Sequence, residues 1–299
     1  MAKPWIKVTA AGMLAALLLL AFQQPAFPSG SRSAQDASSL EKQAGAWADK
    51  LAGSGAEYEN WRDATLHISP LGPGTHSWLV VLTKDENTVG YMIIHADPEG
   101  GYVLGEYGYG PYHPFHAASL LLAEQYTGES LSDGKAESVY VQPLLALWQW
   151  SHGKEPLYAD PVHGGPLPVT EEEMKKATEL EADMPIRHGV TIPHASLTSQ
   201  LDLPSFQPYD RMPWLTESPI PLESDARSLL RALQNNEQEI RYTAELYSES
   251  IQYVWSVIGY DLWEDQVLYV KLYSNQEVES VRIIPFHYLA KMGQFYSSS

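Results

Sequence analysis

The chain has 299 residues and a mass of 33.3 kDa, which allows one large domain or two ordinary ones. It carries 37 acidic residues against 19 basic ones, a formal net charge of −18. This balance argues against a nucleic-acid-binding protein, because phosphate contacts need a cationic surface. The absence of cysteine excludes disulfides, cysteine nucleophiles, thiolate zinc sites and iron–sulfur clusters.

The first 27 residues are predicted to be a signal peptide or a single-span membrane anchor. Lys3 and Lys7 precede an apolar run from Val8 to Phe22, in which 13 of 15 residues are hydrophobic. Fifteen helical residues span roughly 22 Å, less than a bilayer core, whereas residues 8–27 are long enough to cross it. Cleavage before Ala34 and retention as an anchor both stay open. In either case the lysines place the rest of the chain outside the cytoplasm, secreted or membrane-anchored.

Residues 35–182 are predicted to form a first α+β domain. An apolar stripe at helical spacing indicates a helix over residues 36–51. Four short β-rich runs follow, separated by Asp, Asn, Gly and Pro turns, and this pattern is typical of an antiparallel meander. The expected strands are 65–68, 76–83, 89–96 and 102–107.

The second part of this domain is expected to be more mixed. A helix is predicted over residues 115–126, an extended aromatic segment within 138–151 and a short returning strand at 157–160. A further helix is predicted over residues 170–181. Thr170 with Glu173 three residues later has the pattern of a capping box at its start.

Residues 183–222 contain seven prolines and are either a linker or a segment that wraps around the domains. Their apolar residues favour wrapping, namely Leu201, Leu203, Phe206, Tyr209, Met212, Trp214 and Leu215. Residues 223–299 then repeat the opening plan, with a helix at 223–233 and strands at 239–247, 251–260, 267–273 and 278–284. The expected fold class is therefore α+β, with two units of a helix plus an antiparallel meander joined by a Pro-rich segment.

Several short motifs resemble the PepSY and related protease-propeptide modules of exported bacterial proteins. They are Val89-Gly-Tyr-Met-Ile-Ile, Tyr102-Val-Leu-Gly-Glu-Tyr-Gly, and Tyr158-Ala-Asp160 with Gly164 and Leu167-Pro168. The resemblance implies an extracytoplasmic, non-catalytic module that binds or restrains a partner such as a peptidase. No recognisable peptidase domain accompanies the module in this chain.

Two aromatic clusters are the candidate binding residues. Tyr107, Tyr109 and Tyr112 are interleaved with glycines and prolines, and Trp148 and Trp150 would face the same side of a strand. Aromatic rings beside glycines suit peptide or glycan binding because they offer a large contact area. The alternative interpretation is that these rings pack into the core.

Two histidines offer the only metal hypothesis. His113 and His116 lie three residues apart before a predicted helix, but the sequence has no His-Glu-x-x-His motif and no third ligand at zinc spacing. No cofactor is expected.

We therefore expect a non-enzymatic binding or regulatory protein of the bacterial cell envelope, whose partner is a peptide, a protein or an envelope component. The membrane is a second partner if residues 8–27 are retained, and nucleic acid is not a partner. The alternative is an envelope hydrolase, metal-assisted through His113 and His116. A purely structural role in a membrane assembly is a third option.

Overall fold

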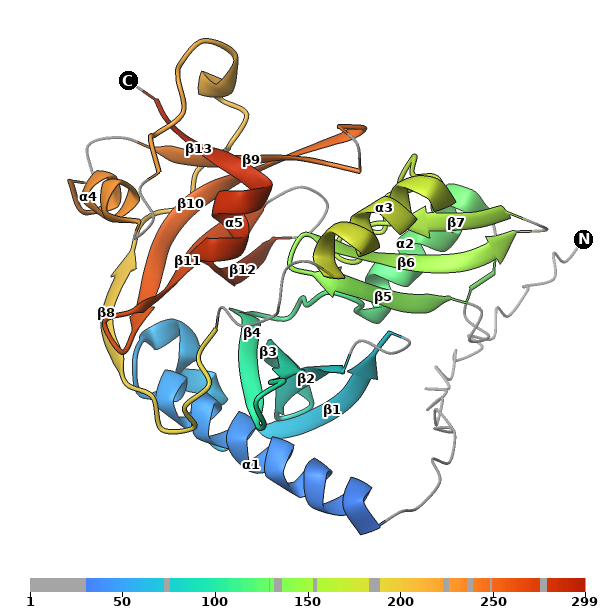
Figure 1. Cartoon of the computed structure of the whole chain (residues 1–299), viewed down its shortest axis with the longest axis vertical. Helices are drawn as coiled ribbons and strands as arrows, with labels where there is room; N and C mark the ends of the chain where they lie inside the picture. Colours follow the sequence, from blue (N-terminus) through green and yellow to red (C-terminus); the bar gives the residue numbers. More distant parts are fainter. Residues whose placement is uncertain are drawn as a thin grey trace, which may run out of the picture.

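The structure, a computed structural model, describes residues 31–72, 76–128, 130–131, 136–152, 155–182, 189–222, 226–235, 239–247, 249–274 and 279–298 (Figure 1). The expected export segment at residues 1–27 lies outside these residues. Among the helices described, none combines the length and apolar character needed to cross a membrane.

A large antiparallel sheet organises the molecule (Figure 1). Its strand order is β1-β2-β3-β4-β12-β11-β10-β9-β13, with β8 paired to β10 beside that path. The first meander consists of β1 Thr65–Leu71, β2 Ser77–Lys84, β3 Asn87–Ala96 and β4 Tyr102–Tyr109. The second consists of β9 Ile240–Leu246, β10 Ile251–Trp263, β11 Val267–Ser274 and β12 Ser280–Pro285.

The two meanders join through their last strands. β4 pairs with β12 in antiparallel fashion, with Tyr107 opposite Ile283. Each meander follows a helix, α1 (Ser31–Ala52) in the first unit and α4 (Arg227–Asn235) in the second. The described residues thus combine helices with a mostly antiparallel sheet, as expected for an α+β fold. The Pro-rich stretch does not separate two sheets, because both units contribute to the same one.

Helix α1 covers one face of the large sheet (Figure 1). The stripe predicted from the sequence is buried, with Leu40, Trp47 and Leu51 at most 2% exposed. These side chains pack in one core with Val80 and Met92 of the first meander. Burying each large side chain contributes about 1.5–3 kcal/mol, so the stripe fixes the helix on this face.

A second, three-stranded sheet lies over the opposite face of the first meander (Figure 1). Its strands are β5 Glu137–Gln142, β6 Leu145–His152 and β7 Glu155–Ala159. Helices α2 (Ala117–Thr127) and α3 (Glu171–Ala182) cover its two sides. The predicted capping box of α3 is present: the Glu173 carboxylate accepts from the Thr170 backbone N–H at 2.7 Å, and Thr170 Oγ1 accepts from the Glu173 N–H at 3.2 Å.

The described part of the Pro-rich segment, residues 189–222, lies against the large sheet at several points. Val190 forms a bridge with Leu104, and β8 (Leu197–Asp202) pairs with β10. Leu203 packs on the core of the second meander and donates its N–H to the Ile258 carbonyl at 2.8 Å.

Three apolar residues of this segment do not wrap. Tyr209, Met212 and Leu215 are 44%, 49% and 69% exposed, so the expectation that they cover the core is wrong.

Four further elements complete the fold. They are two short 3-10 helices, η1 (Ala56–Trp61) and η2 (Pro213–Leu215), the helix α5 (Phe286–Met292) and the strand β13 (Gly293–Ser297).

Candidate functional site

The structure buries three of the five predicted binding residues. Tyr107 is fully buried, and Trp148 and Trp150 are 8% and 3% exposed. The two tryptophans do share one side of β6, as predicted, but that side faces the core shared by the small sheet, α2 and the first meander. Trp148 donates its indole N–H to Ser119 Oγ of α2 at 2.9 Å. The expectation of an exposed aromatic contact surface is therefore corrected to core packing at these three positions.

Tyr109 and Tyr112 are half-buried and do not form one surface with the tryptophans. The Tyr109 ring meets Tyr58 edge-on at 5.5 Å, and burial raises the pKa of Tyr109 to about 12. The Tyr112 ring lies 5.2 Å from His116, at the start of α2.

Two β-bulges, one in β4 and one in β10, determine on which face of the large sheet several polar side chains lie. In β4, Ile93 pairs with Glu106 but Ile94 pairs with Leu104, so Gly105 is an extra residue. One extra residue reverses the alternation of side chains, so Glu106 and Tyr107 exchange the faces they would otherwise occupy. A Cβ at Gly105 would clash with the ring of His95, so the bulge needs glycine.

The bulge in β10 acts in the same way. Its register shifts between Val257 and Gly259, and Gly259 has a φ of +139°. The shift places Asp261 and Trp263 on the face that carries Tyr107. Both bulges are needed to bring these three side chains together.

The first polar cluster surrounds Asp261. Its Oδ2 accepts from the hydroxyl groups of Tyr58 and Tyr107 at 3.0 and 2.7 Å, and its Oδ1 lies 3.1 Å from Lys271 Nζ. Burial and the negative charge of Asp261 both raise the pKa of each tyrosine, so both hydroxyls stay protonated donors. Trp263 donates to Tyr107 Oη at 3.1 Å and closes the network.

Lys271 is the only cation that contacts three carboxylates among the described residues. Its side chain is fully buried, and Nζ lies 2.5 Å from Asp202 Oδ1 and 3.4 Å from Glu57 Oε1 in addition to Asp261. Burial alone would lower the pKa of Lys271, but Asp261 and Asp202 outweigh it, and the pKa is raised. One positive charge thus faces three carboxylates from β8, β10 and η1.

The second polar cluster occupies the opposite face of the sheet. Glu106 is fully buried and accepts from Arg282 through Nη2 at 2.7 Å and Nε at 3.3 Å. Tyr91 and Tyr140 donate to the same carboxylate at 2.9 and 3.3 Å. Because β4 carries Glu106 and β12 carries Arg282, this ion pair joins the two meanders at their seam.

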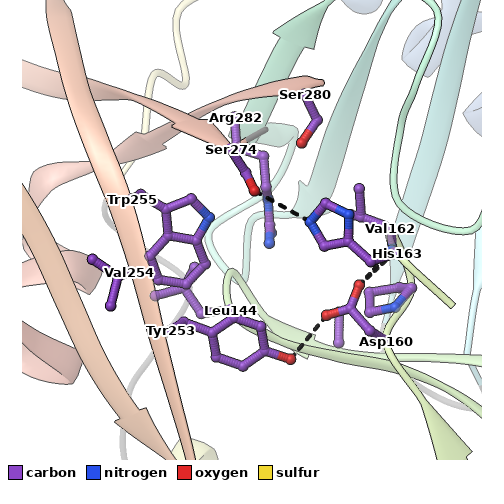
Figure 2. A pocket seen from close by; sticks show the side chains of 12 residues that line it. Leu144, Asp160, Val162, His163, Tyr253, Val254, Trp255, Ser274, Ser280 and Arg282 are labelled. Carbon is purple, nitrogen blue, oxygen red and sulfur yellow. Dashed lines mark hydrogen bonds between the residues drawn. The ribbon is translucent and has the colours of Figure 1, made fainter. Parts of the chain in front are cut away.

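A serine, a histidine and an aspartate meet beside this ion pair (Figure 2). Ser274 Oγ lies 3.4 Å from His163 Nε2, but the Asp160 carboxylate accepts from the backbone N–H groups of Val162 and His163 and from Tyr253. A catalytic triad needs its carboxylate on the histidine ring, and here it binds backbone instead. The cavity between them measures about 20 Å³, room for one water molecule. The cluster is suited to joining the small sheet to the large one and not to turning over a substrate.

The two histidines of the metal hypothesis contact backbone groups instead, and His113 Nδ1 lies 2.8 Å from the Pro114 carbonyl. His116 caps α2: its Nδ1 accepts from the Ser119 N–H at 3.1 Å, and its Nε2 donates to the Val162 carbonyl at 3.0 Å. Both ring nitrogens are therefore engaged. Burial lowers the pKa of His116 to about 4, which keeps the ring neutral in this role. In the part of the chain that the structure describes, no group of three His, Asp or Glu side chains is placed to hold a metal ion.

An open groove of about 470 Å³ lies between the small sheet and α3. It is lined by Tyr158 and Met174 and by the charged residues Glu155, Glu171 and Lys175. No buried nucleophile or acid–base pair converges on it among these lining residues.

Three of the six exposed large hydrophobic residues in the described chain lie on one compact loop between β8 and α4, residues 207–217, which we call the projecting loop (Figure 1). Backbone hydrogen bonds within it include Leu215 N–H to the Met212 carbonyl and Glu217 N–H to the Pro213 carbonyl, at 3.0 and 2.7 Å. Trp214 contacts Tyr209 edge-on, with ring centroids 6.2 Å apart. Such internally bonded loops hold a fixed shape and are often functional.

Buried Arg241 of β9 anchors one end of the projecting loop. Its Nε donates to the Pro208 carbonyl at 2.7 Å, and its guanidinium stacks over Phe206 at 4.7 Å. At the other end Ile220 donates its N–H to the Phe295 carbonyl of β13 at 2.7 Å. The loop is thus held by the neighbouring strands β9 and β13 at its two ends while its tip faces solvent.

Comparison of the chain with protein-family models, curated proteins and solved structures found no match. The function is therefore inferred from the arrangement of the chain's own residues.

Proposed function

We propose that this chain is a non-enzymatic, extracytoplasmic binding or regulatory protein of the bacterial cell envelope, and that it contacts a protein partner through the projecting loop. The observation that carries the proposal is the concentration of exposed apolar side chains on that loop. Of the six exposed large hydrophobic residues in the described chain, three fall within seven positions: Tyr209, Met212 and Leu215.

The chemistry of the loop favours a protein partner. Tyr, Trp and Met are enriched in the centres of protein–protein interfaces, and charged rims surround such centres. Asp210, Arg211 and Glu217 provide such a rim beside the apolar tip. Because both ends of the loop are anchored, little conformational entropy would be lost when a partner binds.

The charge of the chain argues against a lipid occupant. Anionic lipid surfaces attract polybasic segments, whereas this chain carries a formal net charge of −18. The loop itself contains two acidic residues and one basic residue. We therefore expect the partner to be a protein, and the resemblance to PepSY modules implies a partner such as an exported peptidase.

A regulatory rather than catalytic role is supported by how the buried polar groups are used. The Asp261, Glu106 and Asp160 carboxylates each accept several hydrogen bonds from groups that join separate elements. Such satisfied networks rigidify a scaffold. The cationic and then apolar pattern of residues 1–27 supports the external location.

In-cell photo-crosslinking tests the proposal. A photo-reactive amino acid replaces Met212 in the full chain, and a matched variant carries it at Asp49, exposed on α1 at the other end of the molecule (Figure 1). We expect one discrete protein adduct from position 212 and none from position 49. Adducts only to lipid, or the same adducts from both positions, would contradict the proposal.

A further inference from the structure

Lys271 reaches across a neighbouring strand to meet its carboxylate partner. Gly259 of β10 pairs with Lys271 of β11 on one side and with Asp202 of β8 on the other. Gly259 has no side chain, and a Cβ there would clash with the Leu201 carbonyl. The lysine side chain therefore passes over the glycine, and its Nζ lies 2.5 Å from Asp202 Oδ1.

The surroundings of this pair combine burial with a second carboxylate. The side chains of Lys271 and Asp261 are both fully buried, and they lie 3.1 Å apart. Tyr58 and Tyr107 hold the other oxygen of Asp261, and the ring of Tyr58 lies 5.8 Å from Lys271 Nζ. An amine, a carboxyl to receive it and a carboxylate to carry protons thus share a site walled by aromatic rings.

We propose that Lys271 Nζ and the side-chain carboxyl of Asp202 condense to an intramolecular amide, with Asp261 as the proton carrier. The ion pair is the main form, since three carboxylates hold Lys271 as an ammonium. The reaction proceeds through the minor neutral form, in which one ammonium proton has moved to Asp202 to give an amine and a carboxylic acid. The amine attacks Cγ of Asp202, and a second proton passes from nitrogen to Asp261. Asp261 returns that proton to the departing hydroxyl, so the C–O bond breaks and one water molecule leaves. The net reaction joins an ammonium and a carboxylate and needs no oxidant or co-reactant.

Three features of the structure favour this condensation. Holding the two groups in contact replaces a bimolecular reaction by an intramolecular one, for which effective concentrations reach about 10⁵–10⁸ M. The reactive neutral pair holds the same number of protons as the ion pair, so no proton is taken from solvent. The Asp202 side chain is 51% exposed, which gives the released water a path out.

The bond would supply a covalent constraint that this chain cannot obtain from cysteine. It would close the chain between residues 202 and 271, joining β8 to β11 across β10. Long closed loops restrict the unfolded chain most. The inference is independent of the proposed binding function, since it concerns the scaffold and not the projecting loop.

Mass spectrometry of the intact, full-length chain tests the proposal. The measured wild-type mass should be lower by one water than the mass calculated from the sequence that starts at the observed N-terminus. Proteolysis should release a branched peptide that joins residues 202 and 271. Asp202→Ala and Lys271→Met should show no such loss, while Asp49→Ala, which removes an exposed carboxylate on α1, should keep it. The melting temperature of Asp202→Ala should fall on the order of 10 °C.

Two further variants separate the bond from a simple ion pair. Asp202→Asn should form the same amide by losing one ammonia, so its final mass equals that of the cross-linked wild type. Asp261→Asn should fold but form the bond at least tenfold more slowly, because the proton carrier is gone. A wild-type chain of full mass, or a branched peptide that joins Lys271 to Asp261 or Glu57, would overturn the proposal. The mass of Asp202→Asn tests the amide bond even if Asp202→Ala fails to fold.

Discussion

Replacing Glu106 by alanine would leave Arg282 as a buried, unpaired cation at the seam between the two meanders. The carboxylate of Glu106 accepts two hydrogen bonds from Arg282 and one each from Tyr91 and Tyr140, and its side chain is fully buried. In the wild type the Glu106 charge outweighs the effect of burial and raises the pKa of Arg282. In the variant this charge is absent, but an arginine guanidinium is too basic to lose its proton in a protein, so the cation stays buried and charged.

The expected cost follows from this burial. Removing one partner of a buried ion pair destabilises a protein by about 3–5 kcal/mol. For a chain of this size, about 2–4 °C of melting temperature corresponds to each kcal/mol, so the shift should be on the order of 10 °C. Replacing both Glu106 and Arg282 by methionine should cost less than the sum of the single changes, because no uncompensated charge remains.

Urea unfolding followed by circular dichroism measures these differences. The matched control is Glu179→Ala, which breaks an exposed Lys175–Glu179 pair whose side chains are 76% and 66% exposed. That change should alter stability by less than about 0.5 kcal/mol. If Glu106→Ala costs no more than the control, the ion pair does not hold the seam, and the reasoning fails.

Three further outcomes are expected. His116→Asn keeps an N-cap on α2 but removes a histidine whose pKa is about 4 in the folded chain and 6.5 when free. Because the unfolded chain binds the proton first as the pH falls, the stability of the wild type should drop between pH 6.5 and 4. The stability of the variant, measured by urea unfolding across the same range, should drop less. Trp148→Ala should lower the free energy of unfolding by about 3–5 kcal/mol in the same assay, because the residue is buried in the core. An unchanged stability would mean that Trp148 lies on the surface. Gly259→Ala should cost about 2 kcal/mol or more, because φ is +139° and the added Cβ meets the Leu201 carbonyl; a neutral effect would mean that the β10 bulge does not need glycine.

The local patterns of the sequence predict most of the elements. The α1 stripe, the capping box of α3 and both four-strand meanders follow from spacing and turn residues that lie close together in the chain. The join between β4 and β12 does not, because strand neighbours 176 residues apart leave no local signal. The sequence therefore predicts two units but not that they share one sheet.

The sites are harder to predict for the same physical reason. The spacing of Trp148 and Trp150 predicts that they share a side of a strand, but whether that side is covered depends on α2 and the first meander. The Lys271 cluster draws Glu57, Asp202 and Asp261 from three separate parts of the chain. Gly105 and Gly259 are the sequence features that could have predicted the bulges in β4 and β10, since isolated glycines within strands indicate bulges.

The projecting loop shows the converse error. Tyr209, Met212 and Leu215 are apolar and lie in a Pro-rich stretch, so composition alone favours burial. The hydrogen bonds within residues 207–217 instead form a closed loop whose tip faces solvent, and Arg241 anchors it at its base. Backbone closure of this kind is not visible in hydropathy.

The affinity of the crosslinked partner for a loop variant tests the central claim most directly. In that variant Tyr209, Met212 and Leu215 are replaced by serine, and the control carries serine at the exposed Leu121 and Tyr126 of α2. We predict that the loop variant keeps its melting temperature within about 2 °C, since exposed side chains add little stability, and binds the purified partner at least about tenfold more weakly. The α2 control should bind like wild type. Equal affinity of the loop variant and wild type would contradict the account.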